Sequence, residues 1–167
     1  LAGSKGVGTF GGSEDHTAIL CGQAGKLSCY SYCPVRLERH VAVPKGFVFV
    51  IGASGVVASK TGSAREKYNR ASRLVSAGLE EWNAATGRND KHLAEALGSS
   101  EDALDKMREL LGQAKREDFS PQELLRRLEH FVAENNEIIP AAIAALSAED
   151  IQEFGRQVDR SQELTET

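Results

Sequence analysis

The residues best suited to chemistry lie near the start of the chain, in the stretch GVGTFGGSEDHTAILCG, residues 6–22. Gly6, Gly8 and Gly11 form the pattern G-x-G-x-x-G, which lets the backbone of dinucleotide-binding proteins approach a pyrophosphate. The acidic residues and the histidine that follow, residues 14–16, are foreign to that motif. The chemistry therefore depends on which of these two features forms a site.

The dinucleotide interpretation lacks the elements that it needs. Such a motif follows a strand, and an acidic residue about 20 positions later binds the ribose. Only LAGSK precedes Gly6, which is no strand pattern, and residues 30–36 contain no acidic side chain. A phosphate loop is not indicated either, because Lys60-Thr61 follows Ser59 where that motif requires a glycine. We therefore interpret the glycine match as accidental.

A different use of the glycines accounts for the acidic cluster. A glycine-rich turn lets the backbone approach a ligand, and here it leads Glu14, Asp15 and His16 into the first turn of a helix. The helix dipole favours an ionised carboxylate at that position, so Asp15 is a candidate base. Neighbouring helix positions point about 100° apart, so Asp15 and His16 are not expected to share a metal ion.

Cys21, Cys29 and Cys33 make no C-x-x-C pair, the pattern typical of zinc sites and thioredoxin-like motifs. The spacing of Cys29, Cys33 and His40 could be taken as half of a metal site, but alternating strand positions explain it better. We expect free, reduced thiols and no metal at these residues.

The charge and hydropathy of the chain exclude two classes of partner. A net charge of −4 and a pI near 5.6 provide no basic field for a nucleic-acid backbone. The longest apolar runs, such as residues 46–51, are far shorter than the roughly 20 residues of a membrane span, and no signal segment opens the chain. We therefore expect a cytoplasmic protein that binds neither nucleic acid nor membrane.

The elements that would position these residues form an α+β pattern. Ser13 is predicted to cap a short helix that Gly22 and Gly25 end. Three strands are predicted in the segments KLSCYSYCP, VRLERHVAVP and GFVFVIGAS. The third, residues 47–52, is apolar on both faces, as a buried central strand would be.

Beyond ASGVVASKTGSAREK, residues 53–67, the pattern is helical. Ser120 and Pro121 predict a helix start, residues 138–140 a kink or break, and a last helix from about Ala148 is expected to bury Ile151, Phe154 and Val158. Apolar residues at three- and four-residue steps mark the helical core: Ala71, Leu74, Val75, Gly78, Leu79, Trp82, Leu93, Leu97, Leu104, Met107, Leu110, Leu111, Leu124, Leu125, Leu128, Phe131 and Val132.

Read together, these residues resemble galactokinase-like sugar kinases of the galacto-, homoserine, mevalonate and phosphomevalonate (GHMP) kinase superfamily. The segment VGTFGGSEDHTAILCGQAGKL is similar to that family's glycine turn, its Met-Asp-Gln and its Gly-Gln-Lys-Gly turn. The strand FVFVIGAS and the turn at Ser54-Gly55-Val56 resemble a strand ending in Asn-Ser-x-Val. The segment FGRQVDRSQEL is similar to the family's late helix.

The resemblance implies a GHMP-kinase-like fold and ATP-dependent phosphorylation of a monosaccharide. Asp15 matches the aspartate that takes or orients the hydroxyl proton, Gly11 and Gly12 match glycines whose backbone lies against the sugar, and Tyr68 is carried over as a sugar contact. The cofactors implied are ATP and Mg²⁺. Residues 1–45 would end the N-terminal domain, and residues 46–167 would belong to the C-terminal domain.

Several positions depart from the family pattern. Glu14 and His16 replace Met and Gln beside the base, Arg65 stands where a gapless alignment expects the tyrosine, and Gln162 replaces a histidine. The opening sugar motif, the phosphate loop and the closing glycine motif would lie outside residues 1–167, so we expect an internal fragment without turnover of its own. The alternatives are a non-catalytic sugar-sensing relative and an α+β domain with a chance glycine turn.

Overall fold

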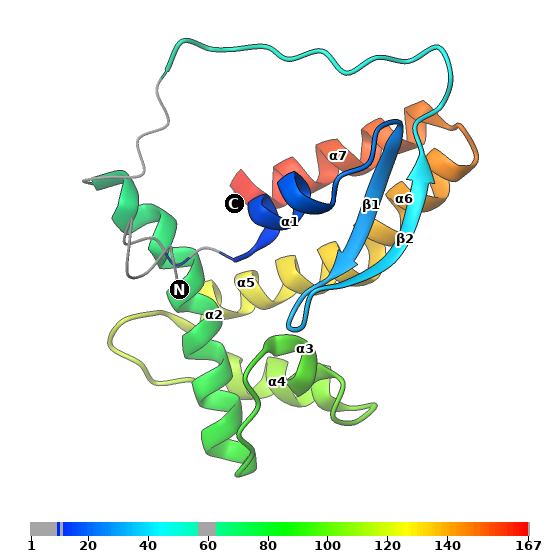
Figure 1. Cartoon of the computed structure of the whole chain (residues 1–167). Coiled ribbons are helices and arrows are strands. Elements are labelled where there is room, and N and C mark those ends of the chain that lie inside the picture. Colours follow the sequence, from blue (N-terminus) through cyan, green and yellow to red (C-terminus); the bar gives the residue numbers. More distant parts are fainter. Residues whose placement is uncertain (1–9, 11, 57–62, 167) are drawn as a thin grey trace. The chain divides into compact units, whose positions relative to one another are not determined.

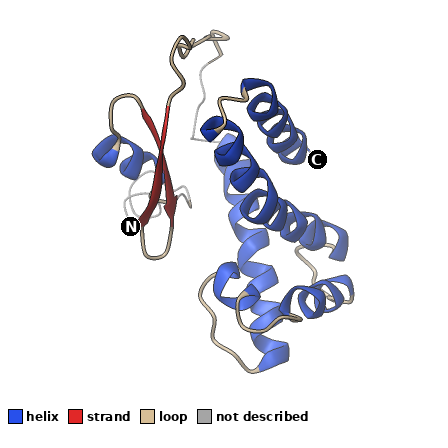
Figure 2. Cartoon of the chain, turned by 90° about the vertical axis from the view of Figure 1, so that its right-hand side faces the viewer, coloured by secondary structure: helices blue, strands red, loops and turns tan. Residues whose placement is uncertain are grey.

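The computed structural model describes residue 10, residues 12–56 and residues 63–166, with the backbone alone given for residues 63, 64, 67 and 68. Within these residues the chain is mostly helical and carries a two-stranded hairpin, which confirms a mixed α+β class (Figures 1 and 2). The chain divides into two compact units. The first contains residues 1–11 and 59–131, and the second contains residues 12–58 and 132–167.

The second unit begins with helix α1 (Glu14–Cys21), which starts and ends where the sequence predicts. The side chain of Ser13 makes no capping hydrogen bond. The backbone carbonyl oxygen of Ser13 instead accepts two hydrogen bonds, one from the backbone N–H of Thr17 at 2.9 Å and one from the Thr17 hydroxyl at 2.8 Å. A Cβ on Gly22 would lie 2.7 Å from the carbonyl oxygen of Ala18, so the helix end requires a glycine.

Strands β1 (Lys26–Ser31) and β2 (Arg36–Ala42) form the antiparallel hairpin (Figure 2). Lys26 pairs with Ala42 and Ser31 with Arg36, with an irregularity in register between Cys29 and Tyr30. These are the first two strands that the sequence predicts.

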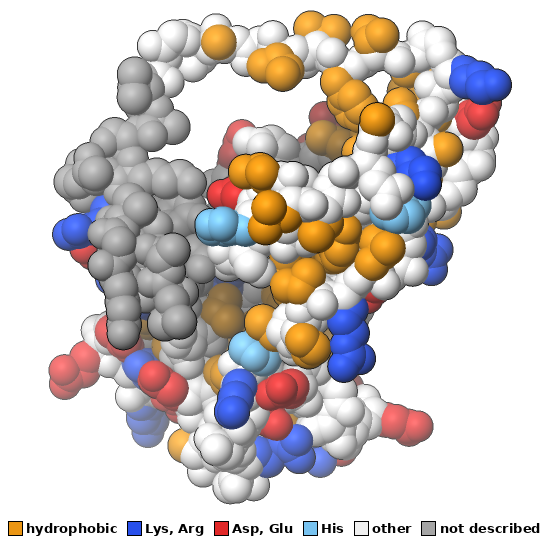
Figure 3. All heavy atoms as spheres, viewed as in Figure 1, with side chains coloured by type: hydrophobic (Ala, Val, Ile, Leu, Met, Phe, Trp, Pro, Cys, Tyr) orange, Lys and Arg blue, Asp and Glu red, His pale blue; other side chains and the backbone are white. Residues whose placement is uncertain are grey.

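The predicted third strand, residues 47–52, is wrong. Within the described residues 43–56 the chain forms no strand, and the side chains of residues 47–51 are exposed, from 53% for Phe47 to 94% for Ile51 (Figure 3). A strand forms only when its backbone makes hydrogen bonds with a neighbouring strand. The apolar composition of residues 47–52 indicates that the segment tends to be buried, but it does not supply that neighbour. The described part of the chain supplies no such neighbour for this segment.

The second unit is completed by helices from the end of the chain. A π-helical turn, η2 (Glu134–Ile138), is followed by α6 (Ile139–Ser147) and α7 (Ile151–Glu166), and α6 packs against β2, η2 and α7. The turn confirms the predicted break, because Pro140 lacks the N–H that a continuous helix would use.

The predicted burial of helix α7 is only partly correct. The helix begins at Ile151 rather than near Ala148, and Ile151 and Phe154 are half-buried. Val158 is 51% exposed, so its predicted burial is wrong. Periodicity marks the apolar face of a helix, but it does not say how much of that face a neighbour covers.

The first unit is built from α2 (Ser63–Thr86), α3 (Leu93–Leu97), α4 (Ala103–Gly112) and α5 (Pro121–Ala133), of which α5 belongs to it as far as residue 131. Helices α2, α3 and α4 pack against one another. Most of the predicted helical core is confirmed, because Gly78, Trp82, Leu93, Met107, Leu111, Leu124 and Leu128 are buried, whereas the predicted burial of Ala71 is wrong, because it is exposed. The structure also buries Ala77, Ala96 and Phe119, which the apolar pattern did not mark.

The start of α5 follows the prediction from Ser120 and Pro121. The Ser120 hydroxyl accepts a hydrogen bond from the backbone N–H of Glu123 at 3.3 Å, and the Glu123 carboxylate accepts one from the backbone N–H of Ser120 at 2.9 Å. This reciprocal pair is a capping box. None of the helices in the described ranges combines the length and the apolar character that crossing a membrane would need.

Candidate functional site

The candidate base, Asp15, lies in the first turn of α1 with its side chain exposed to solvent. Glu14 and His16, its neighbours in sequence, are exposed as well. The free N–H groups at a helix start stabilise negative charge. The fold therefore presents a carboxylate that a ligand from solvent can reach.

One side-chain hydrogen bond is found at each end of α1. Thr17 is buried and bonded to Ser13, which fixes the turn that carries Asp15. At the other end of the helix, the Tyr30 hydroxyl lies 3.5 Å from the carbonyl oxygen of Cys21. Desolvation raises the pKa of Tyr30, and the Cys21 thiol adds to this increase, so the phenol stays protonated and can donate.

Gly12 precedes this turn and has an open environment. It is exposed, and a Cβ placed on it would meet no atom of the described residues within 4 Å. Packing among the described residues therefore does not require a glycine at position 12. A ligand that approaches the backbone closely would require one, because a side chain would occupy its place. Gly11, the other predicted glycine contact, lies outside the described residues.

Sequence reasoning missed Asn69, which is only 4% exposed although it is polar. Its Oδ1 accepts a hydrogen bond of 2.8 Å from the backbone N–H of Phe10, the residue before the paired glycines. Asparagine is unfavourable inside a helix. An asparagine within the predicted helical segment was therefore the signal that could have marked Asn69 as a residue with a specific hydrogen-bond partner.

The other predicted contact, Tyr68, is the neighbour of Asn69 in α2, and its side chain lies outside the described part of the structure. Asp15 and Gly12 belong to the second unit, whereas Tyr68 belongs to the first. The structure thus brings Gly12 and Asp15 together within one local turn. A site that also includes Tyr68 stays a prediction.

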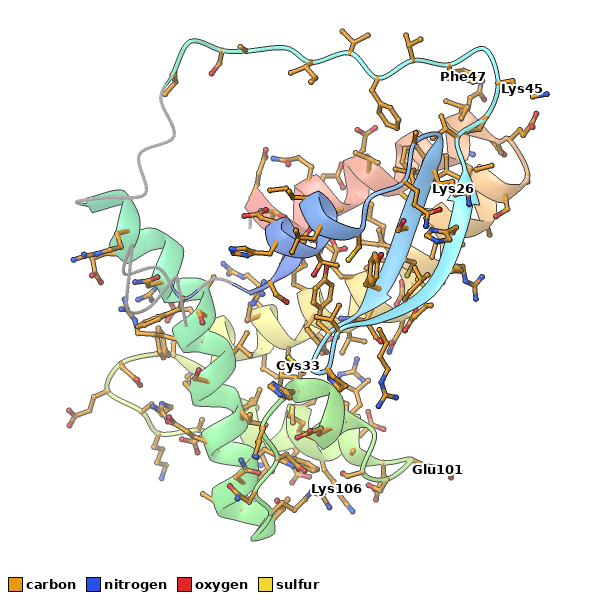
Figure 4. All side chains as sticks on the ribbon, in the orientation of Figure 1. Lys26, Cys33, Lys45, Phe47, Glu101 and Lys106 are labelled. Atoms are coloured by element: carbon orange, nitrogen blue, oxygen red, sulfur yellow. The ribbon has the colours of Figure 1, made fainter. Side chains whose placement is uncertain are left out.

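The cysteines of the hairpin do not assemble a metal half-site. His40 Nδ1 lies 3.0 Å from the Ser28 hydroxyl, and Cys33 is exposed in the turn between β1 and β2 (Figure 4). Burial raises the pKa of the Cys29 thiol, and the nearby Glu38 raises it further, which makes this thiol a weak nucleophile. In residues 10, 12–56 and 63–166, no three His, Cys, Asp or Glu side chains are grouped to hold an ion.

The second unit also contains an apolar cavity of about 220 Å³. It is formed by the hairpin, the segment after β2, and helices α6 and α7. Its walls are Leu27, Val43, Pro44, Phe47, Val48, Phe49, Leu146, Ile151 and Phe154. With no ionisable or hydroxyl side chain among these residues, the cavity suits apolar groups rather than acid–base chemistry.

The candidate site is thus the short turn that contains Gly12, Ser13 and Asp15. No protein-family model, no curated protein and no solved structure matches the chain. The functional argument therefore rests on this turn and on the sequence patterns around it.

Proposed function

We propose that this chain is part of a galactokinase-like, ATP-dependent sugar kinase in which Asp15 is the base. The observation that carries the proposal is the exposed carboxylate in the first turn of α1, three residues after an exposed glycine with no neighbour at its Cβ position. A sugar hydroxyl needs both features, because it must approach the backbone closely and give up a proton.

In this reaction the sugar oxygen attacks the γ-phosphorus of ATP, the bond from that phosphorus to the bridging oxygen of ADP breaks, and the hydroxyl proton passes to the Asp15 carboxylate. Phosphoryl transfer depends mainly on positioning and charge stabilisation. A correctly placed base contributes about 10²- to 10⁴-fold. The bond from Thr17 to Ser13 supports this role, because it fixes the turn that aims Asp15.

Gly12 is the proposed sugar contact next to the base, and the family resemblance adds Gly11 and Tyr68 as predicted sugar contacts. Glu14 and His16 flank the base and are exposed, so they would alter which hydroxyls the pocket accepts. A cytoplasmic location belongs to the same proposal.

Mg²⁺ would neutralise the phosphates of bound ATP in such a kinase. The described residues offer no grouping of three His, Cys, Asp or Glu side chains for it. No residue of this chain is therefore assigned as a magnesium ligand, and no step is derived through the ion.

A second candidate is a sugar-sensing relative without catalysis, and its support is that Glu14 and His16 replace the family's Met and Gln beside Asp15. Such a protein would bind the sugar and ATP but would not transfer the phosphoryl group. Its surface at residues 14–16 would then serve sugar or partner recognition.

The test is ATP-dependent phosphorylation of galactose, galacturonate and arabinose by a protein that joins residues 1–167 to a nucleotide-binding segment. We expect Asp15→Asn to lower kcat by about 10²- to 10⁴-fold with little change in sugar affinity. Glu14→Gln, the matched control in the same turn, should retain most of the activity.

Each result has a distinct meaning. Full activity of Asp15→Asn would refute the role of the base. Binding of sugar and ATP without turnover by the unsubstituted protein would favour the sensor. Residues 1–167 alone are expected to consume no ATP, and turnover by this chain would contradict that expectation.

A further inference from the structure

Helix α1, which carries Asp15, has a single buried side chain. Thr17 is 6% exposed, whereas the other side chains of this fully described helix are exposed. Among them are the apolar residues Ile19 and Leu20, both 82% exposed. A surface helix normally turns its apolar side chains inward. Helix α1 departs from that pattern, because the one side chain that it buries is polar.

The turn that contains Asp15 is closed twice by Thr17. The carbonyl oxygen of Ser13 accepts hydrogen bonds from the Thr17 backbone N–H at 2.9 Å and from the Thr17 hydroxyl at 2.8 Å. Ser13 occupies the N-cap position, but its side chain makes no capping hydrogen bond. Within the described residues, the Thr17 hydroxyl is therefore the only side-chain group that bonds the backbone of residues 13–17.

The burial of Thr17 also accounts for the direction of Asp15. Successive helix positions point about 100° apart, so residues two positions apart lie on opposite sides of the helix. With Thr17 turned inward, Asp15 is turned outward, in agreement with its exposed side chain. The two bonds from Thr17 to Ser13 enclose Asp15 in one closed turn, so the orientation of the carboxylate depends on them.

We propose that Thr17 is a positioning residue for Asp15, and that its hydroxyl keeps the turn of residues 13–17 in the conformation that directs the carboxylate at the sugar hydroxyl. The inference rests on the proposed kinase function. Thr17 is buried, so it neither contacts the sugar nor takes the proton. A displacement on the order of 1 Å near the reacting atoms can lower a rate about 100-fold. The effect of Thr17 therefore passes through Asp15 and falls on kcat rather than on the sugar KM.

Thr17→Val tests this role, because valine keeps the β-branched shape and removes only the hydroxyl. In the protein that joins residues 1–167 to a nucleotide-binding segment, kcat should fall about 3- to 10-fold, the contribution of one hydrogen bond, with the sugar KM unchanged. Thr17→Ser keeps the hydroxyl and should retain most of kcat. The matched control is Thr86→Val. The Thr86 hydroxyl likewise bonds the carbonyl oxygen four positions earlier, that of Trp82, at 2.7 Å, but it lies in α2 and its loss should leave kcat unchanged.

A double variant separates positioning from a general structural effect. If Thr17 acts through Asp15, Thr17→Val should have no further effect on the residual kcat of Asp15→Asn, because no carboxylate is left to orient. A merely structural role would lower kcat by the same factor in both backgrounds. NMR backbone chemical shifts of residues 14–21 in the 167-residue chain should remain helical in each variant.

The role of Thr17 is overturned by an unchanged kcat in Thr17→Val, by equal losses in Thr17→Val and Thr17→Ser, or by a rise in the sugar KM in place of the fall in kcat. An equal further loss in the Asp15→Asn background, or loss of the α1 helix in Thr17→Val, would also overturn it, since Thr17 would then serve stability alone.

Failure of the proposed function gives a different result. Full activity of Asp15→Asn would refute the base, and the role of Thr17 with it. Loss of activity in Asp15→Asn together with full activity of Thr17→Val would leave the base in place and refute only the positioning role.

Discussion

The backbone N–H of Phe10 donates a hydrogen bond of 2.8 Å to Oδ1 of Asn69, which lies 59 positions later in the sequence. Asn69 is almost fully buried. This bond connects the residue next to the paired glycines with the N-terminal half of α2.

We expect Asn69→Ala to lower the free energy of unfolding of the first unit by about 0.5–1.5 kcal/mol, because the part-buried hydrogen bond with the N–H of Phe10 is lost. Denaturant unfolding followed by the fluorescence of Trp82 measures this, since Trp82 is the only tryptophan and is buried in the same unit. The control is Asn89→Ala at an exposed position, with an expected change within about 0.5 kcal/mol. Equal effects of the two substitutions would contradict the assignment.

Glu123 gives the first unit an acid-sensitive component of stability. Its pKa is lowered from 4.5 to about 2, first by the Ser120 backbone N–H and then by contact with Arg70 and the Ser120 hydroxyl. The folded state therefore favours the ionised carboxylate, and this stabilisation is complete above pH 4.5 and lost as the pH falls towards 2.

Glu123→Gln should accordingly make the stability of the first unit less dependent on pH between 4.5 and 2. Denaturant midpoints from Trp82 fluorescence at several pH values measure the slope. The exposed residue Glu117 provides the control substitution, Glu117→Gln. An unchanged slope in Glu123→Gln would show that the capping box is not responsible.

Gly12→Ala should separate ligand binding from folding. The added methyl group meets nothing within 4 Å, and the backbone of Gly12 does not have the positive φ that disfavours alanine, so stability should be unaltered. In the proposed kinase the methyl group would displace the sugar and raise its KM by up to about 100-fold. Gly155→Ala in α7 is the control. If both variants have the same sugar KM, the glycine does not contact the ligand.

Two glycines of the second unit should respond to alanine in opposite directions. Gly155 lies within α7 with no atom within 4 Å of its Cβ position, so Gly155→Ala should stabilise that helix by about 0.4–1 kcal/mol. Gly22→Ala places a Cβ 2.7 Å from the Ala18 carbonyl oxygen and should destabilise the end of α1 by roughly 1–3 kcal/mol. Hydrogen exchange of the α1 and α7 amides measures each effect, and the same sign for both would refute the steric argument.

Elements that depend on neighbouring residues in the sequence are predicted well. The helix start at Ser120 and Pro121, the hairpin that follows Gly25 and the break at Pro140 all have local causes. The candidate base is of this kind, because the position of Asp15 in the first turn of α1 follows from the glycines before it and the apolar helix pattern after it.

The sequence by itself determined which residues form helices and which form the hairpin, because period, caps and turn residues act within a few positions. Only the tertiary structure decided what covers each apolar face. Residues 47–51 are exposed although their apolar composition is typical of a buried strand, and Val158 is 51% exposed. Asn69 accepts a hydrogen bond from the backbone N–H of Phe10, which lies far from it in the sequence. Strand pairing, burial and long-range hydrogen bonds need a partner from elsewhere in space, and a local pattern does not specify that partner.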